Sequence, residues 1–289
     1  MFSLASLFCP LTAQAAAFHG CLPGGALKPF IADYWGTEDV SRRETDPESL
    51  LVVPDACMDV IFDINHTTGT VSGKLCGMGN KPIIAVPART ADAVSVFAIR
   101  FYFWSIHMYA DFHLRGTADP DHDNDIELYF GGWKPFFTEM LLSTLTLAER
   151  AGKADRFLLS KLDESKHNPN VMNALYHLLK KRGASTVADA CAYAGVGRRQ
   201  LERLFQEHIG TTVKKTANLV RYQNLWRDVA FQEHFDVQDA VLKYGYADQA
   251  HLINSFKGYH TLPPLEARQK IRRSMGCDVA FLQYTADRL

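Results

Sequence analysis

An internal repeat in the last third of the chain strongly limits how it can fold. The sequence VADACAYAGV at 187–196 matches VQDAVLKYGY at 237–246, at an offset of 50 residues. After one inserted residue, Leu201 and Phe205 match Leu252 and Phe256 at an offset of 51. Each copy predicts a short helix, a turn at a glycine, and a second helix with apolar residues four apart on one buried face.

Local signals set the ends of these predicted helices. Thr186 with Asp189, and Asp236 with Asp239, have the spacing of helix N-caps. Gly195 and Gly245 then provide the turns. The segment 213–231 carries apolar residues at helical spacing and predicts a rigid helix between the two copies. The whole pattern is typical of a helix-turn-helix unit made twice.

The second helix of each copy has an apolar back and an exposed front suited to a DNA major groove. In the first copy, charged side chains dominate this front, whereas the second copy presents mostly short uncharged groups. The alternative for each residue is an ordinary solvated helix face. The predicted DNA-binding residues are Arg198, Arg199, Glu202, Arg203, Gln206, Gln249, Ala250, His251, Ile253, Asn254 and Lys257.

The charge distribution indicates which half of the chain meets a polyanion. Residues 1–160 hold 12 Lys and Arg against 19 Asp and Glu, whereas residues 161–289 hold 19 against 13. The basic back half favours double-stranded DNA as a partner. Since the net charge of the whole chain is only −1, the two halves must be counted separately for this to be seen.

The paired motifs resemble the AraC/XylS family of bacterial transcription regulators. The pattern G-x-x-x-L-x-R-L-F-x-x-x-x-G fits residues 197–210, and G-Y-x-D-x-x-x-L-x-x-x-F-K fits residues 245–257. A following P-P-x-x-x-R ends at Arg268. Thr261 departs from the glycine usual in the family, and Ala267 departs from the usual aromatic. The resemblance implies a double helix-turn-helix DNA-binding domain over residues 167–273 and a C-terminal tail over residues 274–289.

The front half predicts a separate β-rich domain over residues 1–130. Three runs rich in β-branched and aromatic residues, 50–53, 60–64 and 94–103, are separated by glycines and prolines. The sequence VVPDACMDVIF at 52–62 is similar to the P-D-G-C-x-D-x-I-F signature of one N-terminal domain type in the same family. This resemblance implies a cupin-like β-barrel used for sensing or dimerisation. The expected fold class is therefore α+β.

Helical periodicity returns after the β-rich region. Residues 131–166 are expected to form linker helices, and a further helix is expected from about 170 to 181, before Gly183. The apolar linker helices suit either pairing of two subunits or packing within one. The pattern alone leaves both open.

The six cysteines form no metal-binding spacing, and we expect no metal, no cofactor and reduced thiols. An effector pocket is expected near Cys57, Trp104 and His107. The rival hypothesis is an enzyme in the front half, either a cysteine-dependent alkyl acceptor using Cys57 or a cupin-type catalyst. Cys57 lies between Asp55 and Asp59, and nearby carboxylates disfavour a thiolate.

These observations together predict a sequence-specific transcription regulator that is not an enzyme. Control is expected through an effector or dimerisation in the front half. A cytoplasmic location is expected because the N-terminal apolar run lacks the positive start of a signal peptide and no run is long enough to cross a membrane. RNA polymerase and a second copy of the chain are further candidate partners.

Overall fold

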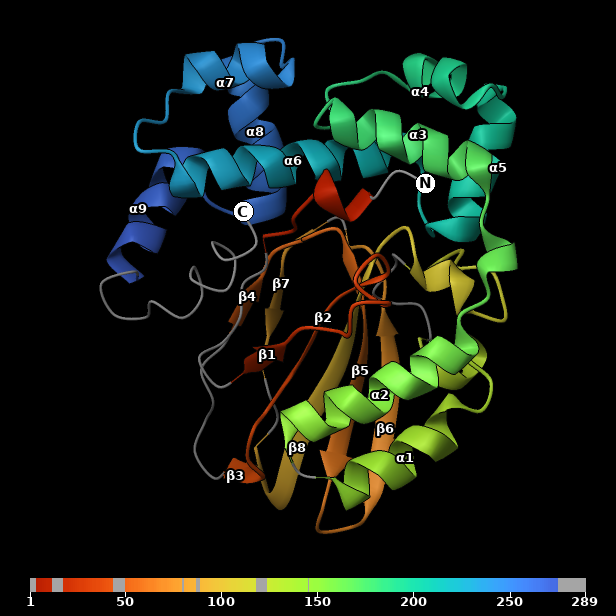
Figure 1. Cartoon of the computed structure of the whole chain (residues 1–289). Helices are drawn as coiled ribbons and strands as arrows, with labels where there is room; N and C mark the ends of the chain where they lie inside the picture. Colours follow the sequence, from red (N-terminus) through yellow and green to blue (C-terminus); the bar gives the residue numbers. More distant parts are fainter. Residues whose placement is uncertain are drawn as a thin grey trace.

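The computed structural model describes residues 4–11, 18–43, 50–79, 81–86, 89–117, 124–144 and 146–274. In this part the chain forms a β domain below and an all-helical domain above (Figure 1). The predicted α+β class is confirmed. Almost all of the predicted tail, 274–289, lies outside the described residues. No described helix combines the length and the apolar character needed to cross a bilayer.

The β domain is built on one six-stranded antiparallel sheet. The strands run in the order β1-β2-β8-β5-β6, and β3 also pairs with β8. A separate two-stranded sheet pairs β4 with β7. All three predicted strand regions are confirmed, in β4, β5 and β8. The bounds are β1 His19–Cys21, β2 Ile31–Gly36, β3 Ser41–Arg43, β4 Leu50–Val52, β5 Cys57–Asn65, β6 Thr70–Cys76, β7 Ile83–Ala85 and β8 Thr90–Tyr102.

The sheet is open and is not closed into the cupin-like barrel that the sequence predicts. Among the described residues, the outer strands β1 and β6 do not pair with each other. Two helices lie there instead: α1, Trp133–Ser143, packs on β6, and α2, Leu147–Lys161, packs on β1 and β2. Helical packing thus covers the face that strand closure would enclose (Figure 1).

An aromatic core joins these two helices to the sheet. Phe62 of β5 stacks on Phe137 of α1 with ring centroids 4.5 Å apart. Phe157 of α2 stacks on Phe136 of α1 at 4.0 Å. The predicted linker helices at 131–166 therefore pack within the β domain of the same chain.

The helical domain contains both predicted helix-turn-helix units. A helix of 19 residues, α6, joins them and has the predicted bounds, Val213–Phe231. The first unit is α4 and α5, the second is α7 and α8, and α3 and α9 flank them. The bounds are α3 Pro169–Lys180, α4 Val187–Ala194, α5 Arg198–His208, α7 Val237–Tyr244, α8 Gln249–His260 and α9 Pro264–Ser274.

The predicted caps form as expected. Thr186 and Asp189 make a reciprocal capping box, and the Asp236 side chain accepts hydrogen bonds from the first backbone N–H groups of α7. Gly195 and Gly245 adopt φ values of 69° and 64°, the left-handed conformation that ends a helix at glycine.

The four predicted anchors face the core. Leu201, Phe205, Leu252 and Phe256 are each 0% exposed. The second helix of each unit is therefore fixed through its back, and its opposite face remains toward solvent. The orientation on which the DNA-binding interpretation depends is confirmed.

One helix end is strained where the sequence departs from the resembled family. Thr261 terminates α8 with φ 70°, a region that β-branched residues rarely adopt. Its side chain is exposed, so no buried contact compensates for this conformation.

We expect Thr261→Gly to raise the free energy of unfolding by about 0.5–1 kcal/mol. Relief of left-handed strain contributes roughly 1–2 kcal/mol, and the greater freedom of glycine in the unfolded chain offsets roughly half of it. Urea unfolding measures the change. The control Ala192→Gly, in exposed helical backbone of α4, should lower stability by about 1 kcal/mol. If Thr261→Gly were less stable than the unmodified chain, the inference that Thr261 is strained would be wrong.

Candidate DNA-binding surface and interdomain cavity

The exposed faces of α5 and α8 carry most of the predicted DNA-binding residues. On α5, Arg198, Arg199 and Arg203 are exposed. On α8, Ile253 is half-buried, and the other predicted residues are exposed, namely Gln249, Ala250, His251, Asn254 and Lys257. The two faces differ in chemistry, since one is cationic and the other is mostly uncharged.

Two predicted residues of α5 are turned toward other parts of the protein. Glu202 is half-buried and its Oε2 accepts the backbone N–H of Val213 at 3.2 Å, at the start of α6. Gln206 lines the cavity between the domains. Arg203 remains exposed, and its guanidinium donates to both carboxylate oxygens of Glu207 at 3.0 Å.

The start of α8 is held in place by its own capping group. The Asp248 carboxylate accepts the His251 backbone N–H at 2.7 Å. Tyr246, just before the helix, packs edge-on against the His251 ring at 5.2 Å and lies beneath the Arg221 guanidinium at the same distance. The polar face of α8 is therefore presented on a rigid helix end.

A seam of buried polar contacts joins the helical domain to the β domain. The Gln223 side chain of α6 is fully buried, accepts the Leu11 backbone N–H at 2.8 Å and donates to the Pro54 carbonyl at 2.7 Å. It thereby links α6 to the N-terminal segment and to the turn before β5. The periodicity of α6 gave no sign of this contact, which joins residues far apart in sequence.

The end of α5 makes the second part of this seam. The Leu114 N–H donates to the Glu207 carbonyl at 3.1 Å. The backbone of Gly210, with φ 79°, lies so close to the Leu114 backbone that an added Cβ would be 2.6 Å from the Leu114 carbonyl oxygen. The rings of His107 and His208 also meet across the seam, with centroids 4.8 Å apart.

Two residues of the predicted effector pocket lie in packed regions instead. Trp104 is 3% exposed, and its ring N–H donates to the Pro29 carbonyl at 3.3 Å. His107 is buried in the seam, and neither of its ring nitrogens has a hydrogen-bond partner. Of the three predicted residues, only Cys57 lines the interdomain cavity.

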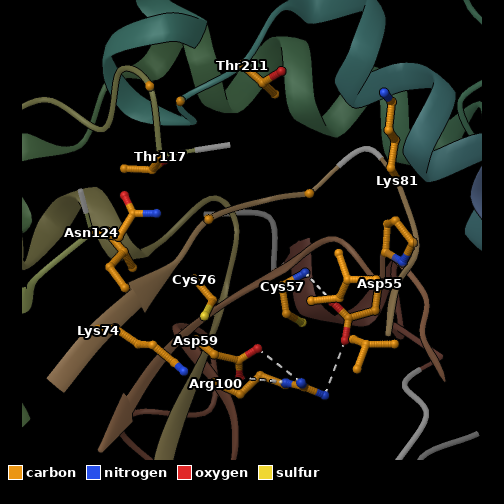
Figure 2. Close-up of a pocket in the computed structure, with 18 of the residues that line it drawn as sticks. Asp55, Cys57, Asp59, Lys74, Cys76, Lys81, Arg100, Thr117, Asn124 and Thr211 are labelled. Atoms are coloured by element: carbon orange, nitrogen blue, oxygen red, sulfur yellow. Dashed lines mark hydrogen bonds and ion pairs between the residues drawn. The ribbon is translucent and has the colours of Figure 1, made fainter. Parts of the chain in front are cut away.

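That cavity has a volume of about 1130 Å³ and is lined by both domains (Figure 2). Strands β5, β6 and β8 form one side, and the α5–α6 connection forms the other, where Thr211 lies. Its volume is slightly above the range of roughly 300–1,000 Å³ that is typical of small-molecule sites.

A buried ion cluster lies at the β-domain side of the cavity (Figure 2). The Arg100 guanidinium donates to both carboxylate oxygens of Asp59, at 2.9 and 3.0 Å, and lies 3.3 Å from Asp55. Sheet register explains part of this, because Asp59 of β5 stands directly opposite Arg100 of β8. The sequence signal that could have predicted this ion pair was the presence of an arginine and an aspartate within otherwise apolar strands.

The environment of Cys57 gives no support to the alkyl-acceptor alternative. Burial, followed by the nearby Asp55 carboxylate, raises the pKa of the Cys57 thiol well above its usual value. A raised pKa disfavours the thiolate that nucleophilic chemistry requires. Among the residues that the structure describes, no group of three or more His, Cys, Asp or Glu side chains is placed to hold a metal ion.

Two family models match the chain. Residues 190–270 match a family described as "Helix-turn-helix domain", and residues 19–119 match a "Domain of unknown function (DUF6597)". The first match confirms the AraC-type helix-turn-helix region expected from the sequence and supports DNA-binding transcription regulation. No curated protein matches the chain.

Solved structures show weaker likeness. A transcriptional regulator with an AraC-type DNA-binding domain from Chromobacterium violaceum is 24% identical, with 36% of this chain and 92% of that one covered and a TM-score of 0.32. ToxT from Vibrio cholerae is 13% identical, with 82% of this chain and 98% of that one covered and a TM-score of 0.36. These TM-scores are too low to support an argument about the site.

We expect Arg100→Met to lower the free energy of unfolding by about 3–5 kcal/mol, because it leaves two buried carboxylates without their countercharge. Urea unfolding at neutral pH measures this. Lys74→Met is the control: its pair with Asp63, at 3.8 Å, is half exposed, and its loss should cost less than about 1 kcal/mol. If the two substitutions lowered the free energy of unfolding equally, the buried ion cluster would not have the stabilising role inferred for it.

The seam should weaken in acid. Burial, followed by the charge of His208, lowers the pKa of His107 to about 3, and burial also lowers the pKa of His208. Lys166 and His167 face His107, while His113, Arg203 and Glu207 face His208. Well above the ordinary histidine pKa of about 6.5, both rings are neutral in the folded and in the unfolded chain, so protonation of these rings costs no stability there.

Below that pH the unfolded chain binds protons that the folded seam excludes. Stability should then fall by up to about 1.4 kcal/mol per pH unit for each histidine, over about pH 6.5 to 3 for His107 and down to its own lowered pKa for His208. His107→Phe should reduce this slope in urea titrations at several pH values, whereas exposed His234→Phe should leave it unchanged. If the pH dependence of the unfolding free energy were unaltered in His107→Phe, the loss of stability in acid could not be attributed to His107.

Proposed function

We propose that the chain regulates transcription by reading a specific DNA sequence with α5 and α8, under the control of its β domain. The observation that supports this most directly is the burial of Leu201, Phe205, Leu252 and Phe256. Buried anchors at equivalent positions give two equivalent helices, each with an exposed face that can enter a major groove.

The length of α6 suits such a double contact. At 1.5 Å per residue, its 19 residues span about 28 Å. Successive major grooves on one face of a duplex are about 34 Å apart. A rigid connector of this length supports placement of the two units in neighbouring grooves, so that one subunit covers about two turns of DNA.

The two faces are proposed to read different bases. Arg199 and Arg203 can each donate two hydrogen bonds to guanine. Arg203 must share or give up its contact with Glu207 to do so. On α8, Asn254 and Gln249 can recognise adenine, and Ala250 and Ile253 can contact thymine methyl groups.

The remaining predicted residues have supporting roles in this proposal. Arg198 and Lys257 are exposed cations at the helix ends and are proposed to contact phosphates, as is the exposed His251 on the first turn of α8. Glu202 is proposed to position α6 through Val213, and Gln206 to face the cavity rather than DNA, because of the contacts described above.

We further propose that the β domain controls the helical domain through the seam at Gln223 and the end of α5. A small-molecule effector or a second copy of the chain acting on the β domain would change this seam, and RNA polymerase would receive the output. A cytoplasmic location follows from action on DNA.

We expect Arg199→Ala and Asn254→Ala each to weaken binding to the preferred DNA by about tenfold or more, since each base contact contributes about 1–3 kcal/mol. Each substitution should also relax selectivity at its own base position. Gel shifts with randomised duplexes, followed by sequencing of the bound fraction, measure both effects.

Gln206→Ala is the matched control on the same helix as Arg199. Because Gln206 lines the cavity, its loss should leave DNA affinity and preference unchanged when no effector is present. Unchanged sequence preference in both Arg199→Ala and Asn254→Ala would overturn the proposed base reading.

A further inference from the structure

Three cations at the interdomain cavity have no acidic partner among the described residues. Lys81, Arg115 and Lys215 all line the cavity and are exposed. None of the three forms an ion pair with a carboxylate in the part of the chain that the structure describes. They therefore give the cavity positive charge that no carboxylate of the described residues neutralises.

The other charged groups of the lining are already paired. Arg100 is held by Asp55 and Asp59, as described above. Lys74 lies 3.8 Å from Asp63, and Asp125 lies 4.0 Å from Lys134. A ligand in the cavity would thus meet lining charges that are already paired, together with three cations that no described carboxylate neutralises. This favours an anion with more than one negative charge.

The unpaired cations come from both domains. Lys81 lies between β6 and β7, and Arg115 follows β8 and the short helix Ile106–Met108, whereas Lys215 lies on the first turn of α6. Figure 2 shows Lys81 extending from the β domain toward the helical domain. The positive end of the α6 dipole adds to the attraction, although Glu202 already accepts one of its N–H groups.

The rest of the lining suits a small organic body. The hydroxyl group of Thr211 can donate a hydrogen bond from the helical domain, whereas that of Thr117 already donates to the Leu114 carbonyl at 2.8 Å. Val53 and Leu75 offer apolar contacts. A volume of about 1130 Å³ exceeds what an inorganic ion requires.

We propose that this cavity binds a small organic anion with at least two negative charges, a phosphate ester or a dicarboxylate, between Lys81 and Arg115 of the β domain and Lys215 of the helical domain. A ligand held by both domains binds only when they are docked. It therefore stabilises the docked arrangement by its differential affinity. The regulatory meaning of this site rests on the proposed function, but the binding itself does not require DNA.

Calorimetry on the full chain without DNA, in phosphate-free buffer, tests the site. The probes are glucose 6-phosphate and succinate as dianions, octanoate as an apolar monoanion, and glucose as a neutral compound. At least one dianion should bind, more weakly as salt is added, and more tightly than octanoate or glucose. Comparison of the two dianions distinguishes a phosphate site from a carboxylate site.

The double variant Lys81→Gln/Lys215→Gln should bind the dianion at least about tenfold more weakly, because charge-assisted contacts are lost from both domains. Lys28→Gln/Lys214→Gln is the matched control. It removes the same charge from exposed positions that do not line the cavity, one in each domain, and should bind as the unmodified chain does.

Three outcomes would overturn the inference: no dianion binds at millimolar concentration, octanoate or glucose binds as well as the dianions, or the double variant and the control bind equally. Gel shifts on the same preparations separate this result from the proposed function. Sequence-specific DNA binding without dianion binding removes only the ligand site, whereas dianion binding without DNA binding removes only the proposed function.

Discussion

The arrangement of the two domains depends on a buried guanidinium. Arg100 holds Asp59 across the sheet and Asp55 in the turn before β5. That turn is strained, since Ala56 adopts φ 60°, at the position where the resembled signature has glycine. The neighbouring Pro54 carbonyl accepts the hydrogen bond from Gln223 of α6. An ion pair inside the β domain thus sets the position of an acceptor that the connecting helix requires.

This chain of contacts explains how a change at the cavity could reach both helices that are proposed to read DNA. The Gln223 side chain is fully buried, so solvent cannot replace its hydrogen bond to the Pro54 carbonyl. Movement of the Pro54 turn therefore either leaves a buried polar group unsatisfied or moves α6 with it. Because α6 packs against α5 and α8, a shift of α6 changes both units together. The cavity, the turn and the connecting helix α6 are therefore mechanically coupled in the docked arrangement.

The sequence was sufficient for features set by local chemistry. The repeat, the caps at Thr186 and Asp236, and the bounds of α6 all follow from residues within one or two turns of each other. It was insufficient where distant segments meet: the open sheet, the packing of α1 and α2 on it, and the burial of His107 and Trp104. Gln206 and Glu202 show the limit most clearly. Helical periodicity places both on the outer half of α5, but only the position of the β domain and of α6 decides what they face.

The two helix-turn-helix units are consequently not equivalent in the full chain. The second half of α5 is held by the β domain through Glu207, His208 and Gly210, whereas α8 packs on α6, α7 and α9 of its own domain. The exposed, mostly uncharged face of α8 is thus not part of the seam described above. Under the proposed function, access of DNA to α5 is expected to depend on this seam. Control by the β domain is therefore expected to act directly on the cationic first unit and to reach the second unit only through α6.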